Sequence, residues 1–277
     1  MTHPNKTQLL PDRPGIPPMA ALPEAETVDP AALAEAYARG DIDLICVLGP
    51  TASGKTRYAV QLARAIAPAE ILSADSRQVY RGMDIGTGKD LGEYGEVPYH
   101  LIDLVPAGSR YNIYEYQAAF ADAYADVRRR GAVPILCGGS GLWIESVTRA
   151  YKFDKGNGVP ADRLPARTFY IGTLVTREER VERIDRRLDE RLEEGLVEEI
   201  RGLLDSGVPA EDLIWYGLEY KFVTQYVLGQ TSLEDMRILL SNAIHQFAKR
   251  QMTWFRGMER DGVRIHWVKP FLSQAGG

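Results

Sequence analysis

The chain has 277 residues, a net charge of −5 and no apolar run near the roughly 18 residues that a membrane span needs, so we expect no contact with a membrane. Apolar and charged residues make up 45% and 26% of it, as in ordinary globular proteins, and no overall basic field points to a nucleic acid, although a local basic patch would suffice. Both cysteines, Cys46 and Cys137, lie in apolar runs and the N-terminus lacks a signal-peptide pattern, so we expect reduced core thiols and a cytoplasmic location.

Residues 1–41 are predicted to form a tail outside the folded domain, which we place at residues 42–277. The first part of this tail is rich in proline and has little apolar periodicity, which is typical of a disordered segment. One short helix is expected over residues 30–39, because the run PAALAEAYAR is followed by Gly40.

Short apolar runs then alternate with helical patterns. We predict strands over residues 42–48, 70–73, 99–104, 133–137 and 169–174, and helices over residues 54–66, 113–130 and from about residue 140. This alternation indicates βαβ units and therefore an α/β fold, with a parallel, P-loop NTPase-like sheet covered by helices on both faces. A polar stretch rich in Gly and Pro, residues 151–167, is predicted to be a linker.

The C-terminal part is predicted to be mostly helical. One long helix is expected over residues 177–204, where the apolar residues share one stripe and the charges of the opposite face are expected to be solvated. A second long helix is expected over residues 233–258 and a closing strand over residues 263–268. The chain should therefore return to the sheet after these helices.

A complete phosphate-binding motif follows the first predicted strand. It matches G-x-x-x-x-G-K-[ST] and consists of Gly49, Pro50, Thr51, Ala52, Ser53, Gly54, Lys55 and Thr56. In such a P-loop, successive backbone N–H groups meet at a helix N-terminus and bind an anion. Lys55 would add a positive charge, and the Thr56 hydroxyl would be a ligand for Mg²⁺.

The acid that an ATPase commonly places after a neighbouring strand is missing from the fourth predicted strand, which ends in glycines and Ser140. Asp75 does follow a strand, the second one. In a doubly wound sheet it would lie at the same carboxyl edge as the P-loop. The residues alone allow three roles for Asp75: a Mg²⁺ ligand, a general base, or the cap of a following helix.

Four blocks of the sequence, taken together, resemble one family. They are GPTASGKT, SADSRQVYRGMDIGTGK, GGSGLWI and AKRQMTWFR, in this order. The chain is similar to the tRNA dimethylallyltransferases, which are P-loop prenyltransferases that place an isoprenoid on the adenosine beside the anticodon. It resembles more loosely the adenylate isopentenyltransferases, which use a free adenine nucleotide.

The resemblance implies a donor, a cofactor and three catalytic residues. The P-loop would hold the diphosphate of dimethylallyl diphosphate rather than ATP. Thr51 and Lys55, with Thr56 and Mg²⁺, would stabilise the charge that develops on this leaving group. Asp75 would be the base that takes a proton from the exocyclic amine of adenine. We expect the enzyme to be a monomer.

The resemblance also implies where the tRNA is bound. The target base has to leave the stack of the anticodon loop, and the residues lining its entry would be Asp75, Ser76, Arg77, Gln78 and Ser140. Gln78 has the donors and acceptor for an adenine edge, but the same pattern also fits a glutamine on a helix surface.

Further candidates for tRNA contact lie in the last block. Lys249 and Arg250 belong to a basic cluster for which phosphate contact and plain solvation are equally compatible with the sequence. Trp254 and Phe255 could stack on a base, although core packing explains both residues as well.

Three features depart from the family. The long helical insertion that helps to clasp tRNA is replaced by the short linker 151–167. The block G-Y-[RK]-[QE] reads Gly217-Leu218-Glu219-Tyr220-Lys221, so the arginine usually offered to the diphosphate is missing and Lys221 is a possible substitute. The threonine-arginine pair before the last block reads Ile244-His245. Because the P-loop and Asp75 are intact, prenyl transfer is better supported than the identity of the acceptor.

Other functions remain open at this point. The missing insertion favours transfer to free AMP, ADP or ATP as the alternative acceptor. A P-loop nucleotide kinase would need lid arginines over its phosphates, and only Arg163 and Arg167 are candidates. A module that only binds nucleotides would leave Asp75 unexplained.

Overall fold

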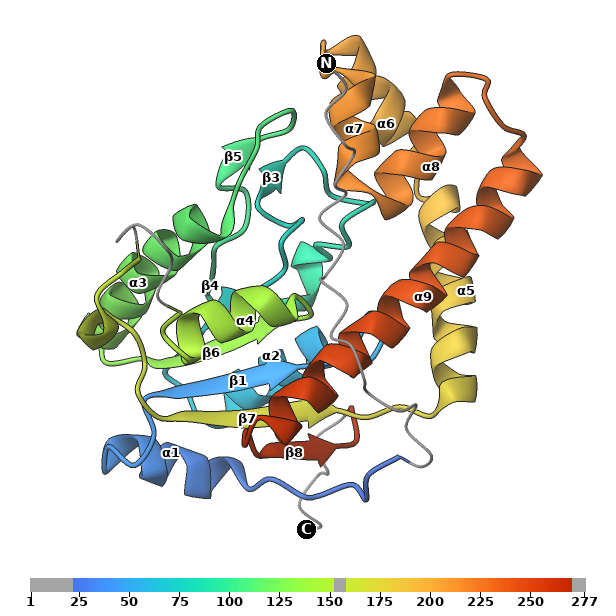
Figure 1. Cartoon of the computed structure of the whole chain (residues 1–277). Coiled ribbons are helices and arrows are strands. Elements are labelled where there is room, and N and C mark those ends of the chain that lie inside the picture. Colours follow the sequence, from blue (N-terminus) through green and yellow to red (C-terminus); the bar gives the residue numbers. More distant parts are fainter. Residues whose placement is uncertain (1–21, 152–157, 271–277) are drawn as a thin grey trace.

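The computed structural model describes residues 22–151 and 158–270 and is built around a six-stranded sheet in the order β4-β2-β6-β1-β7-β8 (Figure 1). Every pair of neighbouring strands in it is parallel. The strands are β1 (Leu44–Leu48), β2 (Ala69–Ser73), β4 (Tyr99–His100), β6 (Val133–Gly138), β7 (Thr168–Thr173) and β8 (Ile265–Val268). The predicted α/β class with a P-loop-like parallel sheet is confirmed.

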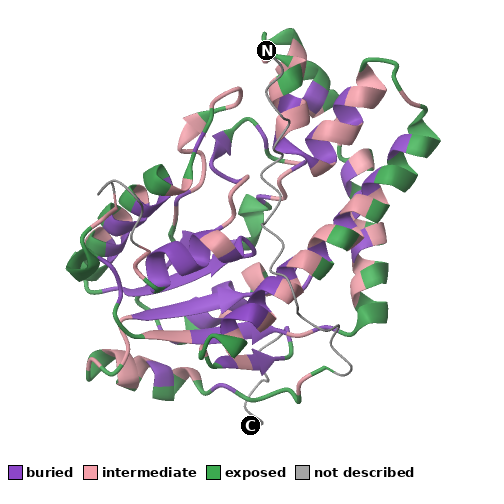
Figure 2. Cartoon of the chain, in the orientation of Figure 1, coloured by how far each residue is buried: buried purple, intermediate pink, exposed green. Residues whose placement is uncertain are grey.

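Helices cover both faces of the sheet, so its central strands are buried on both sides (Figure 2). In β1, Ile45 and Val47 point into the core beneath α1 (Pro30–Ala38) and α2 (Lys55–Ala65). Alternate residues of the same strand point into the larger core beneath α3 (Ile113–Arg129), α4 (Gly141–Thr148) and α9 (Leu233–Arg260). Burial on both faces explains why these strands read as continuous apolar runs.

The helical part consists of α5 (Arg177–Glu193), α6 (Leu196–Asp205), α7 (Ala210–Tyr216) and α8 (Leu218–Val227). It lies at one end of the molecule, and α9 runs from it to the sheet layer (Figure 1). The 28 residues of α9 contact α8 and α5 near one end and α4 near the other. No helix of the described residues is long and apolar enough to cross a bilayer.

Some predicted elements were wrong. The single helix expected over residues 177–204 is two helices, since the chain turns at Gly195, which has a φ of 103°. The strand expected over residues 99–104 keeps only two residues, because Leu101 and Asp103 adopt positive φ. The chain then forms β5 (Val105–Pro106), which pairs with β3 (Tyr80–Arg81) in a separate two-stranded sheet. Helices α7 and α8 were not predicted.

Residues 22–41, expected to belong to the tail, pack against the domain instead. The Glu26 amide donates to the Trp267 carbonyl (2.6 Å), and Val28 and Leu33 are buried in the core beneath α2. Residues 1–21, the part for which disorder was expected, lie outside the described residues. So do residues 152–157 of the linker, whose remainder contains the 3₁₀ helix Ala161–Arg163.

Candidate active site

The carboxyl edge of the sheet opens into a cavity of about 540 Å³, a size typical of sites for small molecules. Residues from the P-loop, from the turn after β2 and from α9 line it together. The predicted site residues found in its wall are Thr51, Lys55, Thr56, Asp75, Ser76, Arg77, Gln78, Ser140, Lys221 and Arg250. The fold thus brings together residues that are far apart in the sequence.

Two hydrogen bonds hold the P-loop in place. The Ser53 hydroxyl is 2.6 Å from the Thr173 hydroxyl of β7, and the Thr51 amide donates to Oε1 of Gln251 on α9 (2.8 Å). Helix α2 begins directly after Gly54, and no side chain caps it. Its first N–H groups therefore face the site together with the Lys55 ammonium, as an anion site requires. Burial lowers the pKa of Lys55, while the nearby charge of Asp75 raises it.

Asp75 lies in a turn and not at the start of a helix. Its Oδ1 accepts from the Arg77 amide (3.2 Å), and residues 76–79 are in turn conformation. The helix-cap alternative is therefore wrong, and the carboxylate closes a turn instead. The Ala74 amide donates to the Cys137 carbonyl at the end of β6 (2.8 Å). This bond fixes the Asp75 turn at the edge of the sheet where Lys55 lies.

Neighbouring polar side chains join this turn to the rest of the wall. The Ser140 hydroxyl accepts from the Ser76 amide (3.0 Å) and lies 3.1 Å from its hydroxyl. Gln78 is buried, and its amide accepts from Ser73 (2.9 Å) and donates to the Gly88 carbonyl (3.2 Å). The helix-surface alternative for Gln78 is therefore wrong, and its hydrogen bonds are made within the protein.

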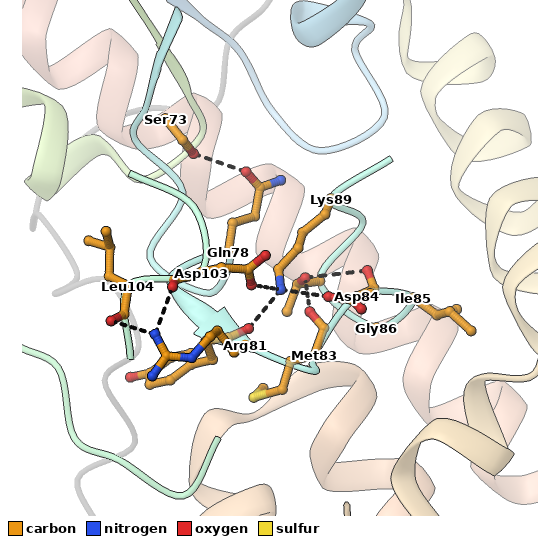
Figure 3. Close-up of polar contacts among 12 residues, drawn as sticks. Ser73, Gln78, Arg81, Met83, Asp84, Ile85, Gly86, Lys89, Asp103 and Leu104 are labelled. Atoms are coloured by element: carbon orange, nitrogen blue, oxygen red, sulfur yellow. Dashed lines mark hydrogen bonds and ion pairs between the residues drawn. The ribbon is translucent and has the colours of Figure 1, made fainter. Parts of the chain in front are cut away.

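The loop of residues 82–89, which we call the fixed loop, supplies Gly86, Thr87 and Gly88 to the next part of the wall, and Figure 3 shows its polar contacts. Lys89 is 1% exposed, and its ammonium donates to the Tyr80 carbonyl (2.7 Å), to Asp84 (2.6 Å) and to Asp103. Residues 84–86 of the same loop donate their amides to the Glu199 carboxylate, at 2.7–3.1 Å. The Gly-rich block 82–88 is therefore rigidly held. No pattern in the sequence predicts that Lys89 is the buried centre of this loop.

Several residues of the site were not predicted. Arg187 and Arg191 of α5, Glu219 of α8 and Gln251 of α9 all line the cavity. Of the two basic candidates in the last block, Arg250 lines the cavity, whereas Lys249 is exposed outside it.

Core packing accounts for the two aromatic residues of the last block. Trp254 is buried and donates from Nε1 to the Glu145 carboxylate (2.8 Å), and Phe255 is fully buried. Neither lines the cavity. Other aromatic side chains form an apolar wall: Tyr111, Trp143, Trp215, Tyr216, Phe222 and Phe247.

The two arginines that a kinase lid would need lie elsewhere. Arg163 pairs with Asp122 (2.6 Å), and Arg167 pairs with Asp43 (3.0 Å), next to the amino end of β1. The P-loop follows the opposite end of this strand. The structure therefore offers no support for a kinase lid made by these residues.

Known proteins match both the sequence and the fold. The family model described as IPP transferase matches residues 78–167 and 155–258. The tRNA dimethylallyltransferase 2 of Porphyromonas gingivalis is 46% identical, and the match covers 83% of this chain and 94% of that protein. The tRNA dimethylallyltransferase 1 of Parabacteroides distasonis is 45% identical, and the match covers 83% of this chain and 93% of that protein.

Solved structures give the same answer. The tRNA isopentenylpyrophosphate transferase of Bacillus halodurans has a TM-score of 0.72 and 27% identity, with 84% of this chain and 91% of that one covered. A eukaryotic dimethylallyltransferase acting on tRNA, 20% identical, shares the fold with a TM-score of 0.70, with 82% and 74% covered. The two family matches overlap at residues 155–167, within the linker 151–167. The chain belongs to the IPP transferase family, among relatives that are tRNA dimethylallyltransferases.

Proposed function

We propose that this protein transfers the dimethylallyl group of dimethylallyl diphosphate to the exocyclic amine of the adenosine next to the anticodon in tRNA, and releases diphosphate. One observation carries the proposal: the Asp75 carboxylate lines the same cavity as Lys55 and Thr56 of the P-loop. A site for a leaving anion and a base for the attacking amine thus face one space. The relatives' names supply the substrate class.

The P-loop would act on the leaving group. As the allylic C–O bond breaks, its electron pair passes to the diphosphate, whose negative charge grows. In this proposal the N-terminus of α2, which no side chain caps, would stabilise this charge together with the Lys55 ammonium and Thr51, and more strongly than the charge of the bound donor. Because the cavity is partly enclosed by apolar side chains, these interactions would be stronger than in water.

A magnesium ion fits the donors that are present. The described residues contain no group of three His, Cys, Asp or Glu side chains that could hold a metal. Mg²⁺ is usually bound by one or two protein oxygens, with phosphate oxygens and water as its other ligands, and the Thr56 hydroxyl is such an oxygen. When bound, the ion would neutralise part of the charge on the diphosphate.

Asp75 would act on the acceptor. The lone pair of the exocyclic amine is delocalised into the adenine ring, so the amine attacks well only if its proton is removed. As the new N–C bond forms, this proton passes to the Asp75 carboxylate, while the diphosphate leaves with the electron pair of the C–O bond. A positioned base of this kind contributes about 10²–10⁴ in rate.

The walls of the cavity suit an extruded base. The residues around Ser76 and Ser140 border its polar side, and aromatic side chains that could stack on a base form the other. Arg77 and Arg250 also line the cavity and are the side chains that we propose for phosphate contacts, with the exposed Lys249 farther out. We propose that a monomer acts on tRNA in the cytoplasm.

The decisive experiment gives the purified protein dimethylallyl diphosphate and Mg²⁺ with one of three acceptors, and detects prenylated adenine by mass spectrometry. The acceptors are unmodified tRNA, the same tRNA with guanosine in place of the target adenosine, and AMP. We expect product with the first acceptor only. Product on AMP but never on tRNA would reject the proposed acceptor and support adenylate transfer.

Two substitutions separate the proposed roles. Asp75→Asn keeps the shape and the turn but removes the base, so kcat should fall by about 10²–10⁴ with little change in the KM for the donor. Lys55→Ala should instead raise that KM, since it removes a charge from the diphosphate site. Full turnover by Asp75→Asn would show that the base has been assigned wrongly.

A further inference from the structure

Two arginines of α5 reach the diphosphate side of the cavity from outside the P-loop. Arg187 and Arg191 line the cavity with Thr51 and Lys55, and both arginines also line a second, small pocket together with Thr51 and Ala52 of the P-loop. Burial lowers the pKa of Lys55, the charge of Asp75 raises it, and the charges of the two arginines lower it, so the three cations repel one another. Such a concentration of positive charge is unfavourable unless an anion is bound there.

Arg191 is nearly removed from solvent, with 9% of its surface exposed. Its Nη1 lies 3.5 Å from Oε1 of Glu219, which is 6% exposed. The other oxygen of Glu219 accepts from Arg77 (2.9 Å). One carboxylate therefore pairs with two guanidinium groups, so Glu219, Arg77 and Arg191 together carry a net positive charge inside the protein.

The backbone of the fixed loop holds the other side of Arg191. Its Nη2 is so close to Gly88, whose φ is 61°, that a methyl group added there would overlap the guanidinium. Arg187 reaches the same glycine and pairs with Asp90. The guanidinium of Arg191 thus lies between Glu219 and Gly88, and these two neighbours limit the orientations that the guanidinium can adopt.

We propose that Arg191 binds the diphosphate beside the P-loop, and that Glu219 is the positioning residue that holds it there. Glu219 is the acid in the block Gly217–Lys221, at the position where a basic residue is expected. In this chain the guanidinium is therefore that of Arg191 on α5, and the position on α8 is occupied by the acid Glu219. The nature of the anion rests on the proposed function. The geometry gives this role to Arg191, whereas the ammonium of Lys221 lies over the Phe222 ring, 5.2 Å from its centroid.

The test uses the full chain and titrates inorganic diphosphate in the presence of Mg²⁺ by calorimetry. Arg191→Met should weaken diphosphate binding about 10- to 100-fold, the range for one charge-assisted hydrogen bond. Arg191→Lys keeps the charge but loses the fork, and should lie between Arg191→Met and the wild type. Arg186→Met is the matched control, because Arg186 is exposed on the same helix and pairs only with its helix neighbours Glu182 and Glu190 among the described residues. Lys221→Met should weaken diphosphate binding less than Arg191→Met does.

Glu219→Gln distinguishes positioning from mere charge. Removing a negative charge beside the site would by itself tighten diphosphate binding, whereas loss of the hold on Arg191 should weaken it about 3- to 10-fold. Tighter or unchanged binding by Glu219→Gln would overturn the positioning role. Thermal unfolding of each variant checks that it is folded.

The remaining outcomes separate this inference from the proposed function. If the wild type binds diphosphate and both Arg191 variants bind it as tightly as the wild type does, the inference on Arg191 is wrong but the proposed function is unaffected. If Lys221→Met loses affinity and Arg191→Met does not, Lys221 holds the role instead. A folded wild type without affinity for diphosphate would overturn the proposed function together with this inference.

Discussion

Gln251→Leu tests whether α9 fixes the P-loop. The Gln251 side chain is 2% exposed, and it accepts from the Thr51 amide (2.8 Å) and donates to the Gly139 carbonyl (2.9 Å). It therefore joins the P-loop to the turn after β6 through one side chain. Leucine has a similar volume, so the substitution removes both hydrogen bonds with little change in packing.

The expected loss follows from the two groups left without partners. A buried backbone group without a partner costs about 1–3 kcal/mol. The Thr51 amide borders the cavity, where water can reach it, and so belongs at the lower end of this range, whereas the Gly139 carbonyl is buried and belongs at the upper end. The sum is about 3–4 kcal/mol, which corresponds to a fall in Tm on the order of 10 °C for a domain of this size.

The assay is urea unfolding followed by circular dichroism, with Gln230→Leu as the control. Gln230 is exposed after α8, and a substitution there should change the free energy of unfolding by less than about 0.5 kcal/mol. If Gln251→Leu changes it as little as the control does, Gln251 does not hold the P-loop. We also expect a higher KM for the donor, because Thr51 would no longer be fixed.

Two further predictions concern buried ions. Lys89→Met removes the ammonium between Asp84 and Asp103 and should lower the free energy of unfolding by about 1–3 kcal/mol in urea titrations, since both carboxylates are exposed enough to regain water; an unchanged midpoint would contradict this. Hydrogen bonds from Arg130 lower the pKa of Glu70 below its ordinary 4.5, so this carboxylate stabilises the fold above that pH and the contribution is lost as pH falls through its lower, folded-state pKa. Glu70→Gln should therefore be less stable than the wild type at pH 7 and approach it toward pH 3, and a constant difference would refute the linkage.

Local sequence signals predicted the sheet and the P-loop because each depends on neighbours in the chain. A strand buried on both faces reads as an apolar run, and the boundaries of β2 and β6 fell within one residue of those predicted. The P-loop needs glycine and lysine at fixed spacing, so its conformation can be predicted from the sequence motif alone. Asp75 was placed correctly because it directly follows a strand of known direction.

The parts that failed depend on tertiary contacts. The apolar stripe of residues 177–204 stays in phase across Gly195, so periodicity could not show that the helix ends there. Arg191 belongs to a run of charges that is typical of a solvated helix face. It is buried because Glu219, distant in sequence and on another helix, lies beside it. Only the fold brings these two charges together.

The position of β8 has a consequence for folding during synthesis. This strand forms beside β7 only after α9 has been made, and its Trp267 carbonyl accepts from the Glu26 amide. At about 5–20 residues per second, the segment around Glu26 leaves the ribosome on the order of tens of seconds before its partner does. A nascent chain therefore keeps the outer side of β7 open until translation reaches the last strand, and a stalled ribosome would present that open edge to other chains.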